Sequence, residues 1–183
     1  MDDISAEKRF EILREFIPEG FVGAEIGVFK GHFSKMLLRK NPRKLYLVDP
    51  WYRAGAQWLW AKNQDNSTLN AFKKILEVFD KEIRNGVVCP VVDFSENFLN
   101  AMEEHSFDLF YLDSSHSYKD TKTELELISL ILKPEGVCLG DDWRDDENHR
   151  HYGVTKAIKE FIQEGRCKLL FHPVHMQWGV KFI

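Results

Sequence analysis

Phe21-Val-Gly-Ala-Glu-Ile-Gly-Val-Phe-Lys-Gly31 joins a short apolar run to a turn that contains two glycines. Val22 to Ile26 are predicted to form a buried strand, and His32 to Lys40 are predicted to continue as a helix. Gly27 and Gly31 allow tight backbone geometry and the close approach of a ligand. A strand, a glycine-containing loop and a helix in this order are typical of a nucleotide site in an α/β protein.

The loop lacks the patterns that bind a pyrophosphate. It contains neither G-x-x-x-x-G-K-[ST], which places a lysine at the β- and γ-phosphates, nor the G-x-G-x-x-G of dinucleotide folds. It contains Glu25-x-Gly27-x-x-x-Gly31, and Asp49 ends the next apolar run, about 20 residues after the loop, where an acid reaches ribose hydroxyls. Alone this pattern is weakly specific, because an ordinary βαβ turn without a ligand can also show it.

Length and composition predict one globular domain over residues 1–183. The chain is 44% hydrophobic and 30% charged, and no apolar run is long enough to span a membrane. The acidic start, Met1 to Ser5, gives no sign of a signal or transit peptide, and three irregularly spaced cysteines argue against a disulfide framework or zinc site. We therefore expect a cytoplasmic protein with no membrane partner.

The charge balance limits the classes of partner. A net charge of −4 argues against a broad nucleic-acid surface, because phosphate contacts need clustered Lys and Arg. The densest basic stretch, Arg39 to Lys44, is more simply the solvated end of a helix and its turn. We expect a small-molecule partner and no nucleic-acid partner. Whether the protein forms a homo-oligomer stays open.

Strands and helices are predicted to alternate along the chain. The predicted strands after the first cover residues 45–48, 87–92, 107–112 and 137–140, and residues 168–171 and 178–183 suit a terminal hairpin. The predicted helices cover residues 5–17, 33–40, 67–84, 98–102, 119–133 and 154–164. This alternation implies a mostly parallel sheet with helices on both faces.

The segment from residue 51 to residue 86 is longer than a simple crossover needs. Tyr52, Trp58 and Trp60 are crowded into a glycine-containing loop. They can pack onto the edge of the sheet or form a lid over a pocket, and both interpretations stay open.

Acidic residues follow the predicted strands. Asp49, Asp93, Asp113 and Asp141 each end a strand, as Gly27 does. Ligands of open α/β sheets bind beyond the carboxyl ends of the strands, so we expect a ligand site at this edge. A helix N-cap or a turn is the alternative role for any one of these aspartates.

Seven motifs follow one another along the chain. They are Glu25-x-Gly27-x-x-x-Gly31, Asp49-Pro-Trp51, Asp93-Phe94-Ser95, Phe107-Asp-x-x-Tyr-Leu-Asp113, His116-Ser-Tyr118, Leu132-Lys-Pro-x-Gly136 and Gly140-Asp-Asp-Trp143. Together they resemble the class I S-adenosylmethionine (SAM) methyltransferases, and in particular methyltransferase family 24, which is akin to macrocin-type O-methyltransferases. The resemblance covers roughly residues 20 to 183. It implies a Rossmann-like sheet of seven strands, the last antiparallel. Glu135 departs from the second glycine that is usual before Gly136.

The resemblance also implies a place for each part of SAM. The loop from Gly27 to Phe29 would pack under the methionine part, and Asp49 would bind both ribose hydroxyls. Residues 93–95 match the segment that borders the adenine, and Glu25 faces the amino end in many relatives. Lys30 could reach the carboxylate, although a solvated lysine is the simpler interpretation. The predicted cofactor-binding residues are Glu25, Gly27, Val28, Phe29, Gly31, Asp49, Asp93, Phe94, Ser95 and Asp113.

The predicted reaction transfers the methyl group to a small molecule, with a hydroxyl as the expected acceptor. A hydroxyl must lose its proton, and His116 with Asp113 is the predicted catalytic pair, because the pKa of histidine is naturally near neutral. The alternative is Mg²⁺ bound by Asp113, Asp141 and Asp142, which are hard oxygen donors on adjacent strand ends. His149 and His151 are interpreted as part of a solvated loop.

Two other functions stay open. An NAD(P)-dependent oxidoreductase could use a related sheet, but it would need the missing pyrophosphate loop. A non-catalytic SAM- or nucleotide-binding module could keep the fold without the activity. The gathering of Asp113, His116, Asp141 and Asp142 at one sheet edge argues against such a module.

Overall fold

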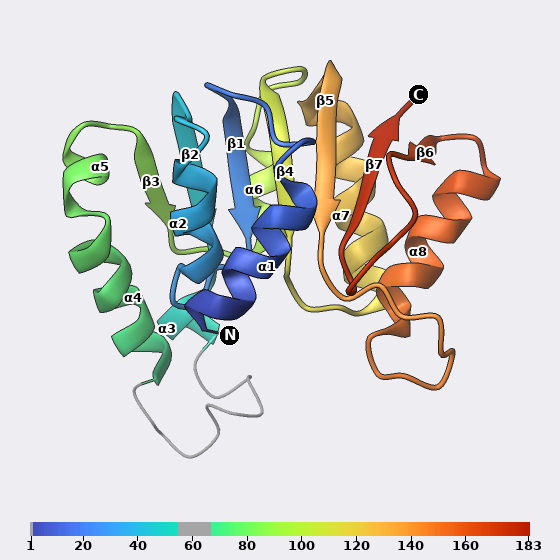
Figure 1. Ribbon diagram of the computed structural model, residues 1–183, viewed down its shortest axis with the longest axis horizontal. Helices are drawn as coiled ribbons and strands as arrows, with labels where there is room; N and C mark the ends of the chain where they lie inside the picture. Colours follow the sequence, from blue (N-terminus) through green and yellow to red (C-terminus); the bar gives the residue numbers. More distant parts are fainter. Residues whose placement is uncertain (1, 55–66) are drawn as a thin grey trace.

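The computed structural model describes residues 2–54 and 67–183. It contains a seven-stranded sheet in the order β3-β2-β1-β4-β5-β7-β6 (Figure 1). β1 to β5 are parallel, and β7 runs antiparallel to both of its neighbours. The strands are β1 Val22–Ile26, β2 Lys44–Val48, β3 Val88–Val91, β4 Phe107–Leu112, β5 Leu132–Gly140, β6 Cys167–Leu169 and β7 Trp178–Phe182. The predicted mostly parallel sheet with its terminal hairpin is confirmed.

Helices cover both faces of this sheet, as predicted. The helices are α1 Asp3–Leu13, α2 His32–Leu38, α3 Trp51–Ala54, α4 Ser67–Val78, α5 Asp80–Arg84, α6 Ser95–Asn100, α7 Tyr118–Ile131 and α8 Tyr152–Gln163. Buried residues of α1, α2 and α4 belong to one hydrophobic cluster, and those of α6, α7 and α8 belong to a second. Figure 1 shows α1 and α2 in front of the sheet and α6 and α7 behind it.

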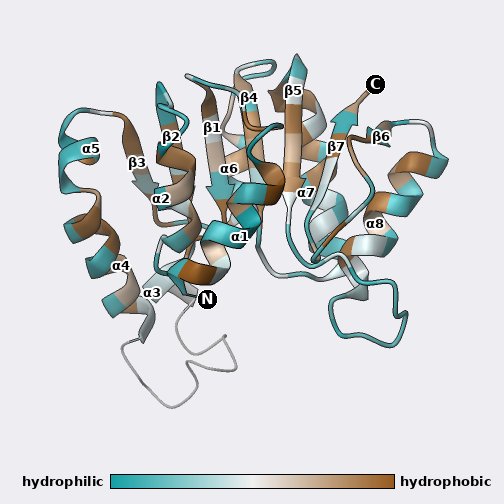
Figure 2. Cartoon of the chain, viewed as in Figure 1, coloured by the Kyte–Doolittle hydropathy of each residue, from teal (hydrophilic) through white to brown (hydrophobic). Residues whose placement is uncertain are grey.

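The central strands supply side chains to both clusters because successive residues of a strand point to opposite faces. In β4, Leu109 and Tyr111 join the cluster under α1 and α2, whereas Phe110 and Leu112 join the one under α6 and α7. A parallel strand that is covered on both faces has no polar side, and the strands in Figure 2 are accordingly mostly hydrophobic.

Several predicted boundaries are wrong in detail. The predicted helix over residues 67–84 is two helices, since Phe79 leaves the helical conformation between α4 and α5. β5 begins at Leu132 rather than at residue 137, because Leu132 pairs with Phe107 before the register shifts. The helix predicted at 98–102 begins at Ser95, after a short connection of residues 92–94 from β3, and ends at Asn100.

The described residues around Trp51 only partly decide whether this segment packs onto the sheet or forms a lid. Trp51 is fully buried, and its indole Nε1 donates a hydrogen bond of 2.8 Å to the Phe29 carbonyl. Tyr52 is 49% exposed and contacts the edge of Phe72. Trp58 and Trp60 lie outside the described residues, so both interpretations of this loop stay open, and the single domain over residues 1–183 stays a prediction. No helix among the described residues is long and apolar enough to cross a membrane.

Candidate active site at the carboxyl ends of the strands

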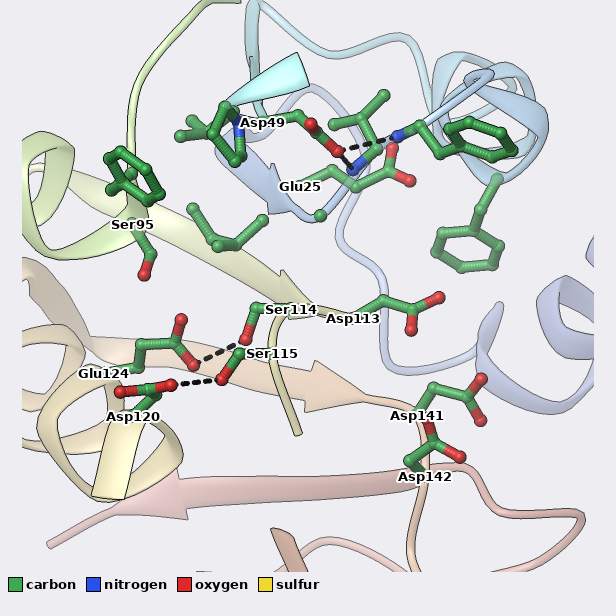
Figure 3. A pocket seen from close by; sticks show the side chains of 18 of the residues that line it. Glu25, Asp49, Ser95, Asp113, Ser114, Ser115, Asp120, Glu124, Asp141 and Asp142 are labelled. Atoms are coloured by element: carbon green, nitrogen blue, oxygen red, sulfur yellow. Dashed lines mark hydrogen bonds between the residues drawn. The ribbon is translucent and has the colours of Figure 1, made fainter. Parts of the chain in front are cut away.

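A cavity of about 890 Å³ opens where β1, β2, β4 and β5 end (Figure 3). The loops after these strands line it, together with the start of α6 and parts of α1 and α7. Most of the residues predicted from the sequence meet here, namely Glu25, Gly27, Val28, Phe29, Asp49, Asp93, Phe94, Ser95, Asp113, Asp141 and Asp142. Gly31 and His116 are absent from the cavity wall in the described part of the chain.

Gly27 lets two backbone segments touch at the floor of the cavity. Its φ is +88°, and a Cβ atom placed on it would lie 2.0 Å from the carbonyl oxygen of Asp113. Its amide donates to the Val48 carbonyl (2.9 Å), and the Asp113 amide donates to the Ile26 carbonyl (2.8 Å). Only glycine fits a position that combines this φ with this contact.

Gly31 is needed for packing between the loop and helices rather than for contact with the cavity. Its φ is +73°, and a Cβ atom there would lie 2.6 Å from Cδ1 of Ile75 and 2.8 Å from Cε2 of Phe79. It starts α2 and lets α4 and Phe79 pack close to the loop. Its predicted role in cofactor binding is therefore indirect at most.

Asp49 organises the glycine loop. Its Oδ2 accepts hydrogen bonds from the amides of Val28 (3.0 Å) and Phe29 (2.9 Å), and its Oδ1 accepts one from the amide of Trp51 (2.7 Å). Burial raises the pKa of Asp49, while these three donors favour the carboxylate. The carboxylate lines the cavity, so it can meet a ligand while it holds the loop in place.

Glu25 is a buried acid at the end of β1. Its side chain is 2% exposed, and the Ser34 hydroxyl donates a hydrogen bond of 2.5 Å to Oε2. Burial raises the pKa of Glu25 to about 8. The side chain therefore carries a proton at neutral pH in the ligand-free protein.

This raised pKa predicts how stability depends on pH. An unfolded chain releases the Glu25 proton near pH 4.5, whereas the folded chain keeps it until about pH 8. Between these values the folded state binds more protons, so its stability falls as pH rises. We expect the Tm of the ligand-free protein to fall from about pH 5 to about pH 8 and Glu25→Gln to flatten this slope. The exposed Glu77→Gln should keep the original slope, and an equal slope in all three proteins would contradict the assignment.

Arg9 enters the cavity from α1 and joins two of the strand-end acids. Its guanidinium donates hydrogen bonds to Oδ2 of Asp113 (2.8 Å) and to the hydroxyl of Tyr111 (3.2 Å), and it also pairs with Asp141. Gln177 donates to the other oxygen of Asp141 (2.6 Å). Burial raises the pKa of Asp141 to about 6, and Arg9 opposes this rise. Arg9 is thus a cation already in place between two of the three carboxylates.

The helix predicted over residues 5–17 was given no place at the ligand site, so Arg9 was missed. Asp2 caps this helix by accepting a hydrogen bond from the Ser5 amide (2.8 Å). Ser5 and Arg9 both line the cavity, and their separation of four residues puts them on one face of the helix. That spacing is the only sign of the role in the sequence.

His116 lies behind the cavity wall between two acids. Its Nδ1 lies 3.2 Å from Oδ2 of Asp142, and its Nε2 lies 3.8 Å from Oδ1 of Asp113. The ring stacks on that of His151 at a centroid distance of 4.6 Å. Burial lowers the pKa of His116, so the ring is neutral at pH 7 and can accept a proton.

A second polar group lies across the cavity (Figure 3). The Ser114 hydroxyl donates to Glu124 (2.8 Å), and the Ser115 hydroxyl donates to Asp120 (2.5 Å). Burial raises the pKa of Glu124 to about 7. Sequence reasoning missed Glu124 because its position on α7 reads as one polar residue in an amphipathic helix.

The residues predicted to border adenine lie at the start of α6. Oδ1 of Asp93 accepts hydrogen bonds from the Phe94 amide (2.8 Å) and from Nδ2 of Asn97 (2.9 Å). The Phe94 side chain is 39% exposed at the rim of the cavity. The segment thus offers an apolar ring beside hydrogen-bonding groups.

A family profile described as a methyltransferase domain, Methyltransf_24, matches residues 24–143. The chain belongs to this methyltransferase family. The matched part runs from β1 to Trp143 and includes every acid that lines the cavity at a strand end. A search of curated proteins finds no match.

Solved structures share the fold of this methyltransferase. An O-methyltransferase from Bacillus cereus in complex with S-adenosylhomocysteine (SAH) is 13% identical, with a TM-score of 0.67 over 98% of this chain and 80% of the other. A candidate methyltransferase from Streptococcus mutans in complex with SAH is 14% identical, with a TM-score of 0.62 over 98% and 96% of the two chains. A candidate RNA methyltransferase from Pyrococcus horikoshii is 12% identical, with a TM-score of 0.63 over 98% and 84%. At these identities the likeness concerns the fold.

Proposed function

We propose that this methyltransferase uses SAM and transfers its methyl group to a hydroxyl of a small molecule. The observation that carries the proposal is the cavity, in which Gly27, Asp49 and Asp113 meet at three neighbouring strand ends. Its volume of about 890 Å³ lies toward the upper end of sites for small ligands, which leaves room for a cofactor and an acceptor. When bound, SAM supplies a methyl group on a sulfonium, which is already activated for transfer.

The cofactor would lie across the floor of the cavity. The backbone from Gly27 to Phe29, which Asp49 holds in place, forms the surface under its methionine part, and Asp49 accepts hydrogen bonds from its ribose. Phe94 and Ser95 border its adenine. Glu25 and Asp113 lie at its amino end, where a bound ammonium group would favour the ionised form of each acid. The two relatives that contain SAH support this choice of ligand.

The acceptor would bind on the side of β4 and β5. Asp113 faces the cavity, burial raises its pKa, and His116 stands behind it at 3.8 Å. In this proposal the pair takes the proton of the acceptor hydroxyl as the methyl group is transferred. Arg9 fixes the other oxygen of Asp113, so the carboxylate is held in one orientation.

His116→Asn should reduce kcat by about 100-fold, the lower end of the usual effect of losing a general base, because the methyl group is already activated. Asparagine tolerates the φ of +61° at this position, so the fold should survive. His105→Asn is the matched control, because His105 has a φ of +52° but lies away from the cavity. In the parent protein, activity should fall only below pH 6.5, and a variant with unchanged kcat would remove His116 from the mechanism.

Mg²⁺ fits this site only in part. Asp113, Asp141 and Asp142 offer oxygen atoms within 4.8 Å of one another. However, Arg9 already pairs with Asp113 and Asp141, and Arg144 donates to Oδ1 of Asp142 (3.0 Å). An ion would have to displace a guanidinium from its partners, so we assign no step of the reaction to Mg²⁺.

The choice of acceptor is tested with SAM labelled on its methyl group. The protein is incubated separately with small hydroxyl compounds, small amines, total RNA and a small-molecule extract. Label in the hydroxyl compounds or in an extracted hydroxyl metabolite is the expected result. Label in RNA alone or in amines alone would overturn the acceptor assignment. No transfer to any fraction would favour the non-catalytic binding module.

A further inference from the structure

A compact group of three side chains borders the cavity on the side of α8. His116 comes from the loop after β4, Asp142 follows β5, and His151 directly precedes α8. Their nearest nitrogen and oxygen atoms all lie within 4.8 Å of one another. Nδ1 of His116 lies 3.2 Å and Nδ1 of His151 lies 3.0 Å from the same oxygen, Oδ2 of Asp142. Two imidazoles and one carboxylate therefore converge on one point.

The contacts around Oδ2 of Asp142 are as short as hydrogen bonds, but at least one of them is poorly aligned. Nδ1 of His151 is buried and has no hydrogen-bond partner of acceptable geometry among the described residues, although Oδ2 of Asp142 lies 3.0 Å away. Donors that bind one ion at about 2.0–2.2 Å, at angles of about 90–110°, lie about 2.8–3.6 Å apart and point at the ion rather than at each other. The spacing and the poor alignment both match that arrangement.

The backbone supports the same conclusion. His116 has a φ of +61° and Asp142 has a φ of +66°, so two of the three residues are in the left-handed region. Residues other than glycine in this region cost conformational energy and gather at functional sites. Both side chains contact His151.

The donor set selects the class of ion. Imidazole nitrogen favours Zn²⁺, Co²⁺, Ni²⁺ and Cu²⁺, whereas Mg²⁺ prefers oxygen alone. Arg144 donates to Oδ1 of Asp142, which leaves Oδ2 free to face the histidines. Arg9 binds Asp113 and Asp141, so those two acids are less available to a cation.

We propose that His116, Asp142 and His151 form a binding site for a divalent transition-metal ion such as Zn²⁺ or Co²⁺. The three side chains provide two nitrogen ligands and one oxygen ligand, and water completes the coordination. This ion site is separate from the proposed methyl transfer, and ion binding can be measured without measuring methyl transfer. Through the proposed role of His116, a bound ion would compete with the proton that this ring accepts and so slow the transfer.

Co²⁺ is the probe, because its visible absorption reports its ligands. Chelator-treated protein is titrated with Co²⁺ and then with Zn²⁺ or excess Mg²⁺. We expect one Co²⁺ per chain, displacement by Zn²⁺ and no displacement by Mg²⁺. His151→Ala and Asp142→Asn should each weaken Co²⁺ binding at least about tenfold, as expected when a ligand is lost. His175→Ala should leave it unchanged, because His175 is exposed and outside the group.

Three results would overturn the proposal. The first is that the parent protein binds no Co²⁺. The second is that the folded His151→Ala variant binds Co²⁺ as tightly as the parent protein. The third is that Mg²⁺ readily displaces bound Co²⁺. Thermal denaturation verifies that each variant is folded. SAM binding is measured on the same samples, so a protein that binds SAM but not Co²⁺ would refute the ion site alone. A protein that binds Co²⁺ but not SAM would refute only the proposed function.

Discussion

Arg9→Gln is expected to lower the free energy of unfolding by about 3–5 kcal/mol near pH 7.5, the range for removing one partner of a buried ion pair. Asp141 is 3% exposed and Asp113 is 17% exposed, so water replaces the lost guanidinium poorly. Without Arg9 the two carboxylates repel each other, and the pKa of each must rise. The loss should therefore shrink as pH falls toward about 6, because the variant binds these protons at a higher pH than the parent protein, in which the pKa of Asp141 is about 6.

Denaturant unfolding of both proteins at two pH values measures this effect. Arg14→Gln is the matched control, because Arg14 is the C-cap residue of the same helix, is 61% exposed and pairs only with Glu11 among the described residues. It should change stability by less than about 0.5 kcal/mol, as surface substitutions usually do. Equal stability of Arg9→Gln and Arg14→Gln would show that Arg9 does not hold the acids together.

Gly27→Ala is expected to cost about 2–5 kcal/mol, shared between stability and cofactor affinity. A left-handed backbone costs an L-residue about 1–2 kcal/mol, and forcing a methyl group into a packed site costs about 1–3 kcal/mol more. The new Cβ would meet the Asp113 carbonyl at 2.0 Å, and neither backbone segment can yield easily. The loop must shift, and the hydrogen bonds from Val28 and Phe29 to Asp49 shift with it.

Gly86→Ala separates the two contributions to that cost. Gly86 has a φ of +73°, and no atom of the described residues lies within 4 Å of its would-be Cβ, so it measures backbone strain alone. Unfolding measurements and SAM titrations of both variants should show a clear excess cost for Gly27→Ala. If the two variants lost equal stability and bound SAM alike, the contact with Asp113 would be unimportant.

Much of the fold could be predicted because its signals are local. Five short apolar runs, each ending in glycine or aspartate, determine the parallel strands, and the pairing of 167–169 with 178–182 follows the predicted hairpin. The boundaries were less predictable. The early start of β5 at Leu132 depends on pairing with Phe107, a contact between residues far apart in the sequence. The break between α4 and α5 falls at Phe79, which packs beside Gly31, a residue that is also far away in the sequence.

The cavity was predictable where the chain itself places the residue at a strand end, as for Asp49, Asp113 and Asp141. Cavity residues that come from the helices could not be predicted in this way. Arg9 reaches the cavity only because α1 crosses the sheet near the end of β4, and α7 brings Glu124 to the far wall. His116 follows β4 as predicted, but the left-handed turn there places its ring behind the wall, next to His151.

Calorimetric titration of the purified protein with SAM, SAH and NAD tests the central claim most directly. A cavity formed by a single glycine loop, with Asp49 at the end of β2 and no pyrophosphate cradle, should bind SAM and SAH at one site per chain and give no heat with NAD. Asp49→Ala should weaken SAM binding by about 1.5–3 kcal/mol, the range for hydrogen bonds to a charged group. Tight binding of NAD with no response to SAM or SAH would contradict the account.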